Sequence, residues 1–286
     1  MKSLIMRLTK NSFIHNVLIL SSGTALAQII GMALTPVITR LYGPEAYGLM
    51  GTYTSVLSIF IPIAALTYPT AIVLPKHDIE AKGLIKLSAI VTFSISLIIL
   101  ILLILFHQLI VDILKLERIA FYLYLIPIVV LFAGLLEIIE QWLIRTKQFA
   151  VSAKVSVIHS FIINGGKVIV GFFYPVASVL ILFSTIKEGL KSLLMILLNK
   201  KPILIFNSTD NITERSISYK KLAKKYRDFP LYRAPQVILN SVSESLPVLM
   251  LTSLFGPASA GFYSLGRTVL AIPSILLGKS VGDVFY

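Results

Sequence analysis

Three charged residues lie in the chain where a bilayer would surround them. Lys167 is near the centre of one long apolar run, Glu244 near the centre of another, and Arg267 about one third into the next. An unpaired charge at mid-bilayer depth costs about 3 kcal/mol, so such residues form ion pairs or face water. Because the runs with Glu244 and Arg267 are consecutive, the two residues come to similar depth. The sequence therefore predicts either a structural ion pair or a water-filled cavity that binds an anion.

Two stripes of polar residues indicate the interior of the same assembly. The first stripe is Ser21, Thr24, Gln28, Gly31 and Thr35, and the second is Ser156, Ser160, Asn164 and Lys167. Spacings of three and four place each stripe on one face of a helix. Close helix packing through small residues and the lining of a polar cavity both explain the stripes, and both interpretations stay open.

Further charged residues lie closer to the ends of apolar runs. Glu137 and Glu140 share a helical face, where headgroups, water or Arg145 are the expected contacts and a proton relay is the alternative. A second cluster comprises Lys187, Glu188 and Lys191. For this second cluster we expect an internal lysine–glutamate pair three residues apart.

The sequence contains no catalytic or metal-binding motif. Cys is absent, which excludes disulfides, thiolate metal sites and a cysteine nucleophile. The four His are scattered, without a ligand spacing such as His-Glu-x-x-His. Gly165-Gly166-Lys167 is not a phosphate-binding loop, because Phe161 stands where that motif needs glycine. We therefore expect no enzyme, no metal and no cofactor.

The composition is that of a membrane protein. Hydrophobic residues make up 56% of the chain, charged residues only 14%, and the mean hydropathy is +0.88, whereas a soluble domain has about 25% charged residues. Eight apolar segments approach the length of about 20 residues that spans a hydrocarbon core. They lie near 14–39, 46–74, 84–106, 119–142, 154–174, 176–198, 234–254 and 260–283. The expected fold is an all-α integral membrane protein with about eight transmembrane helices.

The basic residues predict how these helices are oriented. The net charge is +13, and the N-terminus and the links after the second, fourth and sixth segments carry most of the Lys and Arg. This asymmetry predicts a multi-pass protein of the cytoplasmic membrane with a cytoplasmic N-terminus. The link 199–233 is strongly basic, and it is expected either to lie on the anionic inner leaflet or to be a solvated linker. Because the charges lie between apolar runs, no nucleic-acid partner is expected.

One short pattern occurs twice. Gly43-Pro44 is followed by Gly48, and Gly256-Pro257 is followed by Gly261, so the copies start 213 positions apart. Such a repeat predicts two equivalent halves, related by an axis along the membrane normal. The expected domains are a first six-helix lobe (1–198), a basic cytoplasmic linker (199–233) and an incomplete start of a second lobe (234–286).

The later part of the chain contains two distinctive stretches, Tyr-Arg-Asp-Phe-Pro-Leu-Tyr-Arg-Ala-Pro-Gln from Tyr226 and Gly-Phe-Tyr-Ser-Leu-Gly-Arg from Gly261. They resemble the polysaccharide and O-antigen flippases of the multidrug/oligosaccharidyl-lipid/polysaccharide exporter superfamily, and the resemblance is most specific over 226–286. Leu-Tyr-Gly-Pro-Glu-Ala-Tyr-Gly-Leu from Leu41 resembles the first helical hairpin of the same family. Over 84–200 only the hydropathy matches.

The resemblance implies a carrier that moves a polyprenyl-diphosphate-linked oligosaccharide, a lipopolysaccharide or O-antigen precursor, by alternating access. Its partners would be the lipid-linked oligosaccharide and membrane lipids, and other polysaccharide export proteins stay open. Arg40, Lys167 and Arg267 are the candidates for binding the anionic head group, and Glu244 is a candidate for coupling or for an ion pair. Since such flippases have two six-helix lobes, this sequence is expected to be a C-terminally truncated fragment.

Three other functions stay open. A cation-coupled multidrug exporter of the same superfamily could use Glu244, although the basic groups at mid-depth favour an anionic load. A membrane polymerase or ligase of polysaccharide assembly usually needs a large outer loop, and the predicted outer loops are short. A scaffold in an export complex is the remaining alternative.

Overall fold

The computed structural model describes residues 12–199, 218–268 and 270, and these form helices and turns without a strand. The long helices are α2 (Ser12–Phe60), α3 (Asp78–Leu114), α5 (Ile126–Arg145), α6 (Phe149–Phe173), α7 (Ala177–Leu198) and α9 (Ala234–Phe255). Short helices are α4 (Ala120–Leu123), α8 (Tyr219–Lys225), the 3-10 segments η1 (Ile61–Ile63), η2 (Tyr68–Val73) and η3 (Glu117–Ile119), and the π-helical η4 (Phe229–Arg233). A further helix covers 257–268. The predicted all-α class is confirmed.

The first two predicted spans form the two arms of α2. The helix bends at Gly43, whose φ of 73° and ψ of 169° leave the helical region. Glycine adopts a positive φ without steric cost, and Pro44 has no N–H to continue the helical ladder. Gly256 ends α9 with almost the same backbone angles, φ 85° and ψ 169°. The repeated glycine therefore makes the same turn in both copies.

The second arm of α2 is shorter than the sequence indicates. The predicted span 46–74 is wrong as a continuous helix, because the α-helix ends at Phe60 and gives way to η1 and η2. Pro62 and Pro69 lie in these segments, and each removes a backbone donor. Between them Leu66 and Thr67 have positive φ, an uncommon conformation for residues other than glycine.

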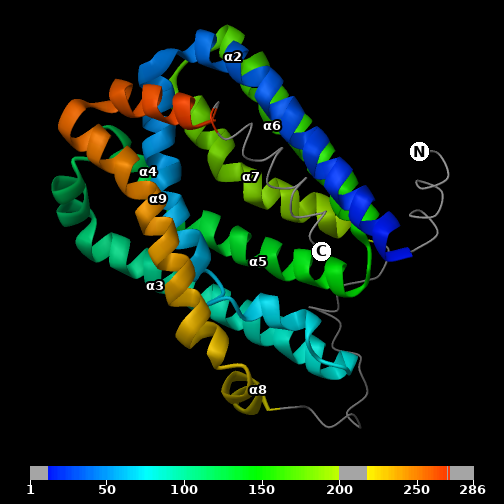
Figure 1. Cartoon of the computed structure of the whole chain (residues 1–286). Helices are drawn as coiled ribbons and strands as arrows, with labels where there is room; N and C mark the ends of the chain where they lie inside the picture. Colours follow the sequence, from blue (N-terminus) through cyan, green and yellow to red (C-terminus); the bar gives the residue numbers. More distant parts are fainter. Residues whose placement is uncertain (1–11, 200–217, 269, 271–286) are drawn as a thin grey trace, which may run out of the picture.

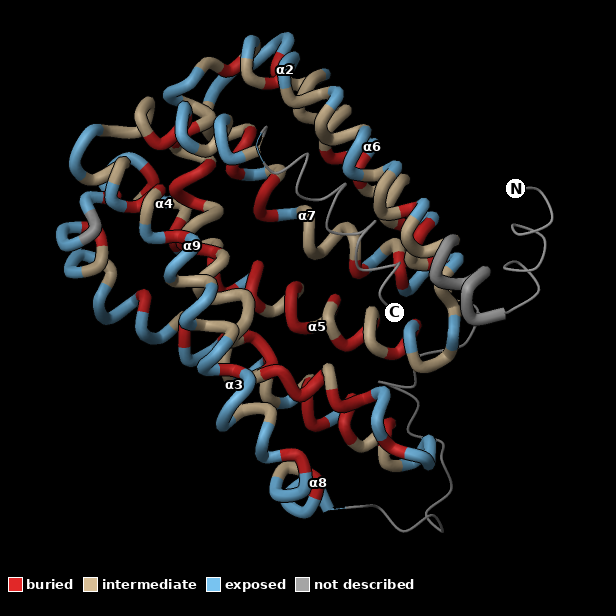
Figure 2. The backbone as a smooth tube through the Cα atoms, in the orientation of Figure 1, coloured by how far each residue is buried: buried red, intermediate tan, exposed pale blue. Residues whose placement is uncertain are grey.

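The helices pack as a layered bundle around α5 (Figure 1). The first arm of α2 lies along α6, and α5 contacts both α3 and α7. α9 crosses the second arm of α2. In Figure 2 the buried positions concentrate on α5, whose most apolar stretch is 61% buried, against 22% for that of α3. α5 is thus the central helix of the bundle.

Five stretches of the described residues are long and apolar enough to cross a membrane. They are Ile19–Ile63, Asp78–Ile113, Ile126–Arg145, Phe149–Phe173 and Phe229–Phe255. Large apolar side chains on their outer faces are exposed, such as Phe93 and Leu105 on α3, as expected of helices that contact lipid. α7 coincides with the predicted sixth span, but its three charged residues exclude it from this set. The predicted eighth span, 260–283, lies mostly outside the described residues.

Candidate functional site

The two polar stripes face each other where α2 packs against α6. A Cβ added to Gly23 would meet the Cβ of Ala153 at 2.5 Å, so the helices touch through small residues. Ser160 Oγ donates a hydrogen bond to the carbonyl oxygen of Ala27 at 2.6 Å. Asn164 Nδ2 donates to the Ser160 carbonyl oxygen at 2.9 Å. Close packing therefore explains part of both stripes, as one interpretation expects.

Six of the nine stripe residues line a cavity of about 430 Å³ that α7 completes. Its lining consists of Thr24, Ala27, Gln28, Ser156, His159, Ser160, Ile163, Asn164, Lys167, Lys187, Glu188 and Lys191. We call this the α2–α6–α7 cavity. Ten of these twelve side chains are polar, in a bundle whose other surfaces are mostly apolar. The structure therefore supports both interpretations of the stripes, and Ser160 and Asn164 take part in both the packing and the lining.

Lys167 is the cation of this cavity without a carboxylate partner. Its Nζ lies 3.8 Å from the sulfur of Met50, a weak acceptor. The Tyr42 hydroxyl donates a hydrogen bond to the Lys167 carbonyl oxygen at 2.8 Å, which fixes the backbone at this turn of α6. Among the described residues, no Asp or Glu lies within ion-pair distance of Lys167. An anion entering the cavity would meet an uncompensated positive charge.

The cluster on α7 connects this cavity with a second one of about 420 Å³. Both cavities are lined by Glu188 and Lys191, and the second also by Glu137, Glu140 and Arg233. Lys191 Nζ lies 2.6 Å from Glu140 on α5. The expected lysine–glutamate pair three residues apart is therefore wrong, because Lys191 reaches across to the neighbouring helix. We call the second space the α5–α7–α9 cavity.

Local contacts hold Lys187, the first residue of the α7 cluster. Lys187 Nζ lies 3.5 Å from the neighbouring Glu188, and a ring nitrogen of His159 is 2.9 Å from the Lys187 carbonyl oxygen. These contacts fix α7 against α6 at the level of the cavity. They leave Lys187 half-exposed, with its charge only partly compensated.

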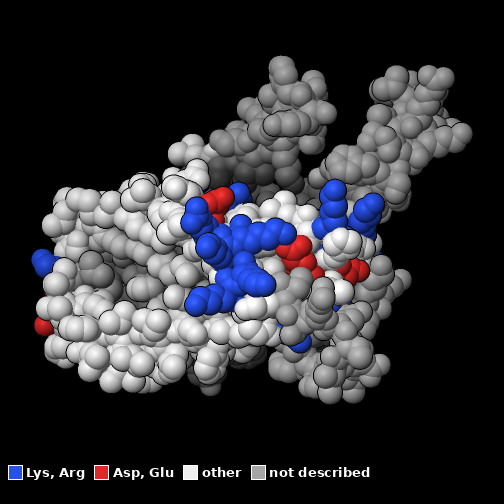
Figure 3. All heavy atoms as spheres, turned by 90° about the horizontal axis from the view of Figure 1, so that it is seen from below, with Lys and Arg blue, Asp and Glu red and all other residues white. Residues whose placement is uncertain are grey.

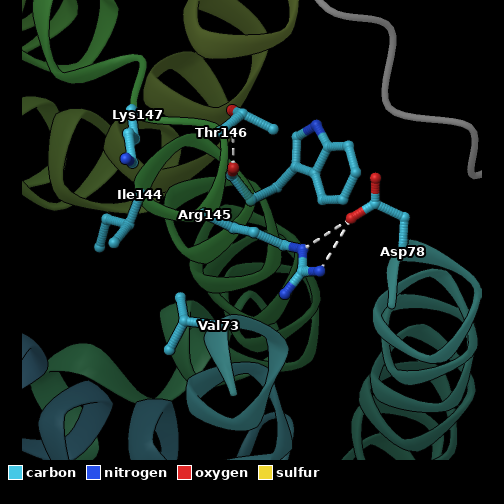
Figure 4. A pocket seen from close by; sticks show the side chains of 7 residues that line it. Val73, Asp78, Ile144, Arg145, Thr146 and Lys147 are labelled. Atoms are coloured by element: carbon cyan, nitrogen blue, oxygen red, sulfur yellow. Dashed lines mark hydrogen bonds and ion pairs between the residues drawn. The ribbon is translucent and has the colours of Figure 1, made fainter. Parts of the chain in front are cut away.

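A third cavity, of about 630 Å³, lies at the end of α5 and contains Arg145 (Figure 4). Arg145 forms an ion pair with Asp78 at 2.8 Å and donates to the carbonyl oxygens of Ile72 and Pro75 at 3.1 Å and 2.7 Å. The expected contact between Arg145 and the glutamates of α5 is therefore not formed. Since its guanidinium joins α5 to α3 and η2, we assign Arg145 a structural role.

The other predicted site residues lie apart from Lys167. Arg40 is exposed near the bend of α2 and lines none of the three cavities described above. Arg267 Nη2 lies 2.8 Å from Glu244 Oε2, and Nη1 donates to the Glu244 carbonyl oxygen at 3.1 Å. The structure thus forms the predicted Glu244–Arg267 pair, on an exposed face. Of the three proposed cationic ligands, only Lys167 reaches a cavity described above.

The two copies of the glycine–proline pattern contact each other. A Cβ on Gly48 would overlap the Pro257 carbonyl oxygen, and a Cβ on Gly261 would overlap the Pro44 carbonyl oxygen. These contacts are reciprocal, as expected where two equivalent elements cross on a pseudo-twofold axis. We call this contact the glycine crossing. It places the start of the second half against the first hairpin.

Comparison with known proteins decides the family. A family model described as polysaccharide biosynthesis protein matches residues 13–286, nearly the whole chain. The chain belongs to this family. With five helices long and apolar enough to cross a membrane among the described residues, this family member is a multi-pass membrane protein. Comparisons with curated proteins and with solved structures give no match.

Part of the cavity lining differs from what the sequence predicts. The expected local pair does not account for Lys187, Glu188 and Lys191, although three charges in an apolar run signal a water-facing surface. Arg233 belongs to the expected linker, but it lines the α5–α7–α9 cavity. Among the described residues, no group of three His, Asp or Glu could hold a metal ion.

Proposed function

We propose that this protein moves a polyprenyl-diphosphate-linked oligosaccharide, a polysaccharide repeat unit, across the cytoplasmic membrane by alternating access. The N-terminus would be cytoplasmic, and no covalent chemistry or cofactor would be needed. The partners would be the lipid-linked oligosaccharide, membrane lipids and other polysaccharide export proteins. The proposal rests first on Lys167, an uncompensated cation in a polar cavity between apolar helices.

The charges around the cavity fit an anionic diphosphate. Lys187 and Lys191 join Lys167 in the lining, with Glu188 as the acid in the same wall. Diphosphate oxygens accept charge-assisted hydrogen bonds from ammonium groups, which would replace part of the water lost on entry. Because the outer faces of the helices are apolar, the prenyl chain would stay in the surrounding lipid while the diphosphate occupies the cavity.

The glycine crossing supports a carrier that opens at one end only. It lies at residues 43–48 of α2, next to Met50, whose sulfur is 3.8 Å from Lys167 Nζ, so it borders the end of the α2–α6–α7 cavity at which Lys167 lies. Thr24 lines the other end of the cavity, roughly 30 Å away along α2 at a rise of 1.5 Å per residue. Tight contact at one end and polar space toward the other are what alternating access requires of a single state.

The test compares surface polysaccharide in a host lacking the gene and carrying wild-type, Lys167→Gln or Lys76→Gln protein. Lys76 is exposed in a connecting segment and lines none of the cavities described above. We expect export to fall at least about tenfold with Lys167→Gln, a loss of about 1.4 kcal/mol, and to stay normal with Lys76→Gln. Normal export with Lys167→Gln, or normal export without the gene in a host with no redundant carrier, would contradict the proposal.

A cation-coupled multidrug exporter is the second candidate. The observation that favours it is Glu137, which lines the α5–α7–α9 cavity beside Glu140 and Arg233. Glu244, the residue expected for this role, is paired with Arg267 on an exposed face instead. Drug resistance that depends on Glu137 and leaves surface polysaccharide unchanged would favour this candidate over the flippase.

A further inference from the structure

The short helix α8 is fixed to the first lobe by one of its faces. Leu222 and Tyr226, four residues apart, are buried against the start of α3. Leu222 packs so closely on Gly83 that a Cβ there would lie 2.6 Å from Leu222 Cδ1. Tyr226 donates its hydroxyl hydrogen to Glu80 Oε1 at 3.1 Å, and Lys225 forms an ion pair with the same carboxylate.

This contact also acts on the charge of Lys225. The hydrogen bond to Glu80 raises the pKa of Lys225 above its usual value, because the carboxylate stabilises the protonated ammonium group. Lys225 is therefore paired with Glu80 on α3. The other basic residues of α8 are left to face outward.

The opposite face of α8 carries a stripe of exposed basic side chains. Lys220 and Lys224 are four residues apart on α8, Lys221 lies beside them, Arg227 follows in the turn after α8, and all four are exposed. None of the four has an ion-pair partner among the residues that the structure describes. Figure 3, which views the molecule from the end where α8 lies, shows basic side chains gathered on this face with few acidic ones. We call these four residues the α8 basic stripe.

The contact with α3 sets the depth of this stripe. α3 has 37 residues and is therefore roughly 55 Å long, whereas the hydrocarbon core is about 30 Å thick. The apolar run of α3 begins near residue 84, next to the glycine on which α8 rests. The stripe thus lies at the level of lipid head groups. Exposed Tyr219, Leu231 and Tyr232 flank it, and aromatic side chains favour this interfacial zone.

We propose that the α8 basic stripe binds the phosphate head groups of anionic membrane lipids. The stripe combines unpaired cations, head-group depth and flanking aromatic side chains, which together fit a lipid surface better than an acidic protein. Because η4 and α9 follow directly, the bound lipids would hold the junction between the two halves at the membrane surface. This inference needs only the membrane placement of α3 and is independent of the cargo.

The absence of Cys allows a direct test by a single spin label. Ser218→Cys places a nitroxide at the exposed first residue before α8. The full chain is reconstituted in nanodiscs of phosphatidylcholine alone or with about 30% phosphatidylglycerol. We expect collisions of the label with a water-soluble nickel complex to be at least about threefold rarer in the anionic discs, and about 0.5 M salt to abolish the difference, since salt screens exposed charges.

Two triple variants, each of which removes three lysine charges, show which lysines cause the difference in collision rate between the two lipids. Lys220→Gln/Lys221→Gln/Lys224→Gln should abolish the difference between the two lipids. Lys76→Gln/Lys147→Gln/Lys154→Gln removes the same charge from exposed lysines outside α8 and should retain it. A label at Glu117→Cys, on the opposite end of the lobe, reports whether each variant is folded.

Three other results would overturn the proposal. Equal collision rates in both lipids would exclude binding to anionic head groups. An effect that survives the α8 variant but not the control variant would assign the lipid contact to other lysines. Protection of the label only in native membranes, and in neither disc, would indicate an acidic protein as the partner.

Discussion

The glycine crossing and the α2–α6–α7 cavity show two opposite ways for apolar helices to meet. At the crossing, Gly48 and Gly261 have no side chain, and backbone contacts backbone. At the cavity, Lys167 and its polar neighbours keep three helices from closing and leave about 430 Å³ between them. The same α2 helix takes part in both. The glycine crossing is therefore a close contact, whereas the cavity has room for a ligand. Substitutions in the two regions should have different effects.

The largest effect is expected at the crossing. Gly48→Ala or Gly261→Ala puts a Cβ where a carbonyl oxygen lies, and such overpacking typically costs about 1–3 kcal/mol, occasionally more. We expect a clear loss of thermal stability in detergent, read by size-exclusion chromatography after heating. Gly266→Ala, in the same helix as Gly261 but with no atom of the described residues within 4 Å of the added Cβ, is the control. Equal stability of all three variants would contradict the close contact.

A smaller effect is expected in the wall between the two cavities. Glu140→Gln leaves Lys191 without its carboxylate, in a site where both side chains are partly buried. Because water reaches the pair, we expect a loss of about 1 kcal/mol rather than the 3–5 kcal/mol of a fully buried pair. The double variant Glu140→Gln/Lys191→Gln should recover most of that loss in the same assay. Additive losses would show that the two residues act independently.

The smallest effect is expected for the Glu244–Arg267 pair. Both side chains are largely exposed, and an ion pair in water contributes about 0–1 kcal/mol. Arg267→Ala should therefore leave the amount of folded protein nearly unchanged, while a larger loss of polysaccharide export would indicate a role in transport. Equal loss of protein and export would favour a purely structural pair.

The sequence predicted the helices well and the contacts between them only in part. The apolar runs predicted most helix positions, because span length depends on local chemistry. The glycine–proline repeat predicted two equivalent elements, and both copies have the same positive-φ turn, at Gly43 and Gly256. The partners of Lys191 and Arg145 could not be predicted, because each lies on another helix. The positive φ of Leu66 and Thr67 had no sequence signal, since neither residue favours that conformation.

The sequence predicted the residues of the candidate site only in part. Lys167 was found because a single charge in a long apolar run is conspicuous, whereas Arg40 and Arg267 lie in none of the cavities that contain Lys167 or the α7 cluster. The sequence gives the position of a residue along a helix, but which face of that helix meets the cavity depends on how the helices pack. The boundaries of the two lobes and the linker stay predictions.

The most direct test of the account measures whether the α2–α6–α7 cavity attracts anions. Asn164→Cys puts a single thiol in its lining, one helical turn from Lys167. Unit charges about 4 Å apart in water interact by about 1 kcal/mol, so an anionic thiosulfonate reagent should react roughly fivefold faster than a cationic one of similar size. Lys167→Gln should bring the two rates together. A cationic reagent that reacts as fast as the anionic one with Lys167 in place, or no reaction with either, would contradict an anion-binding cavity.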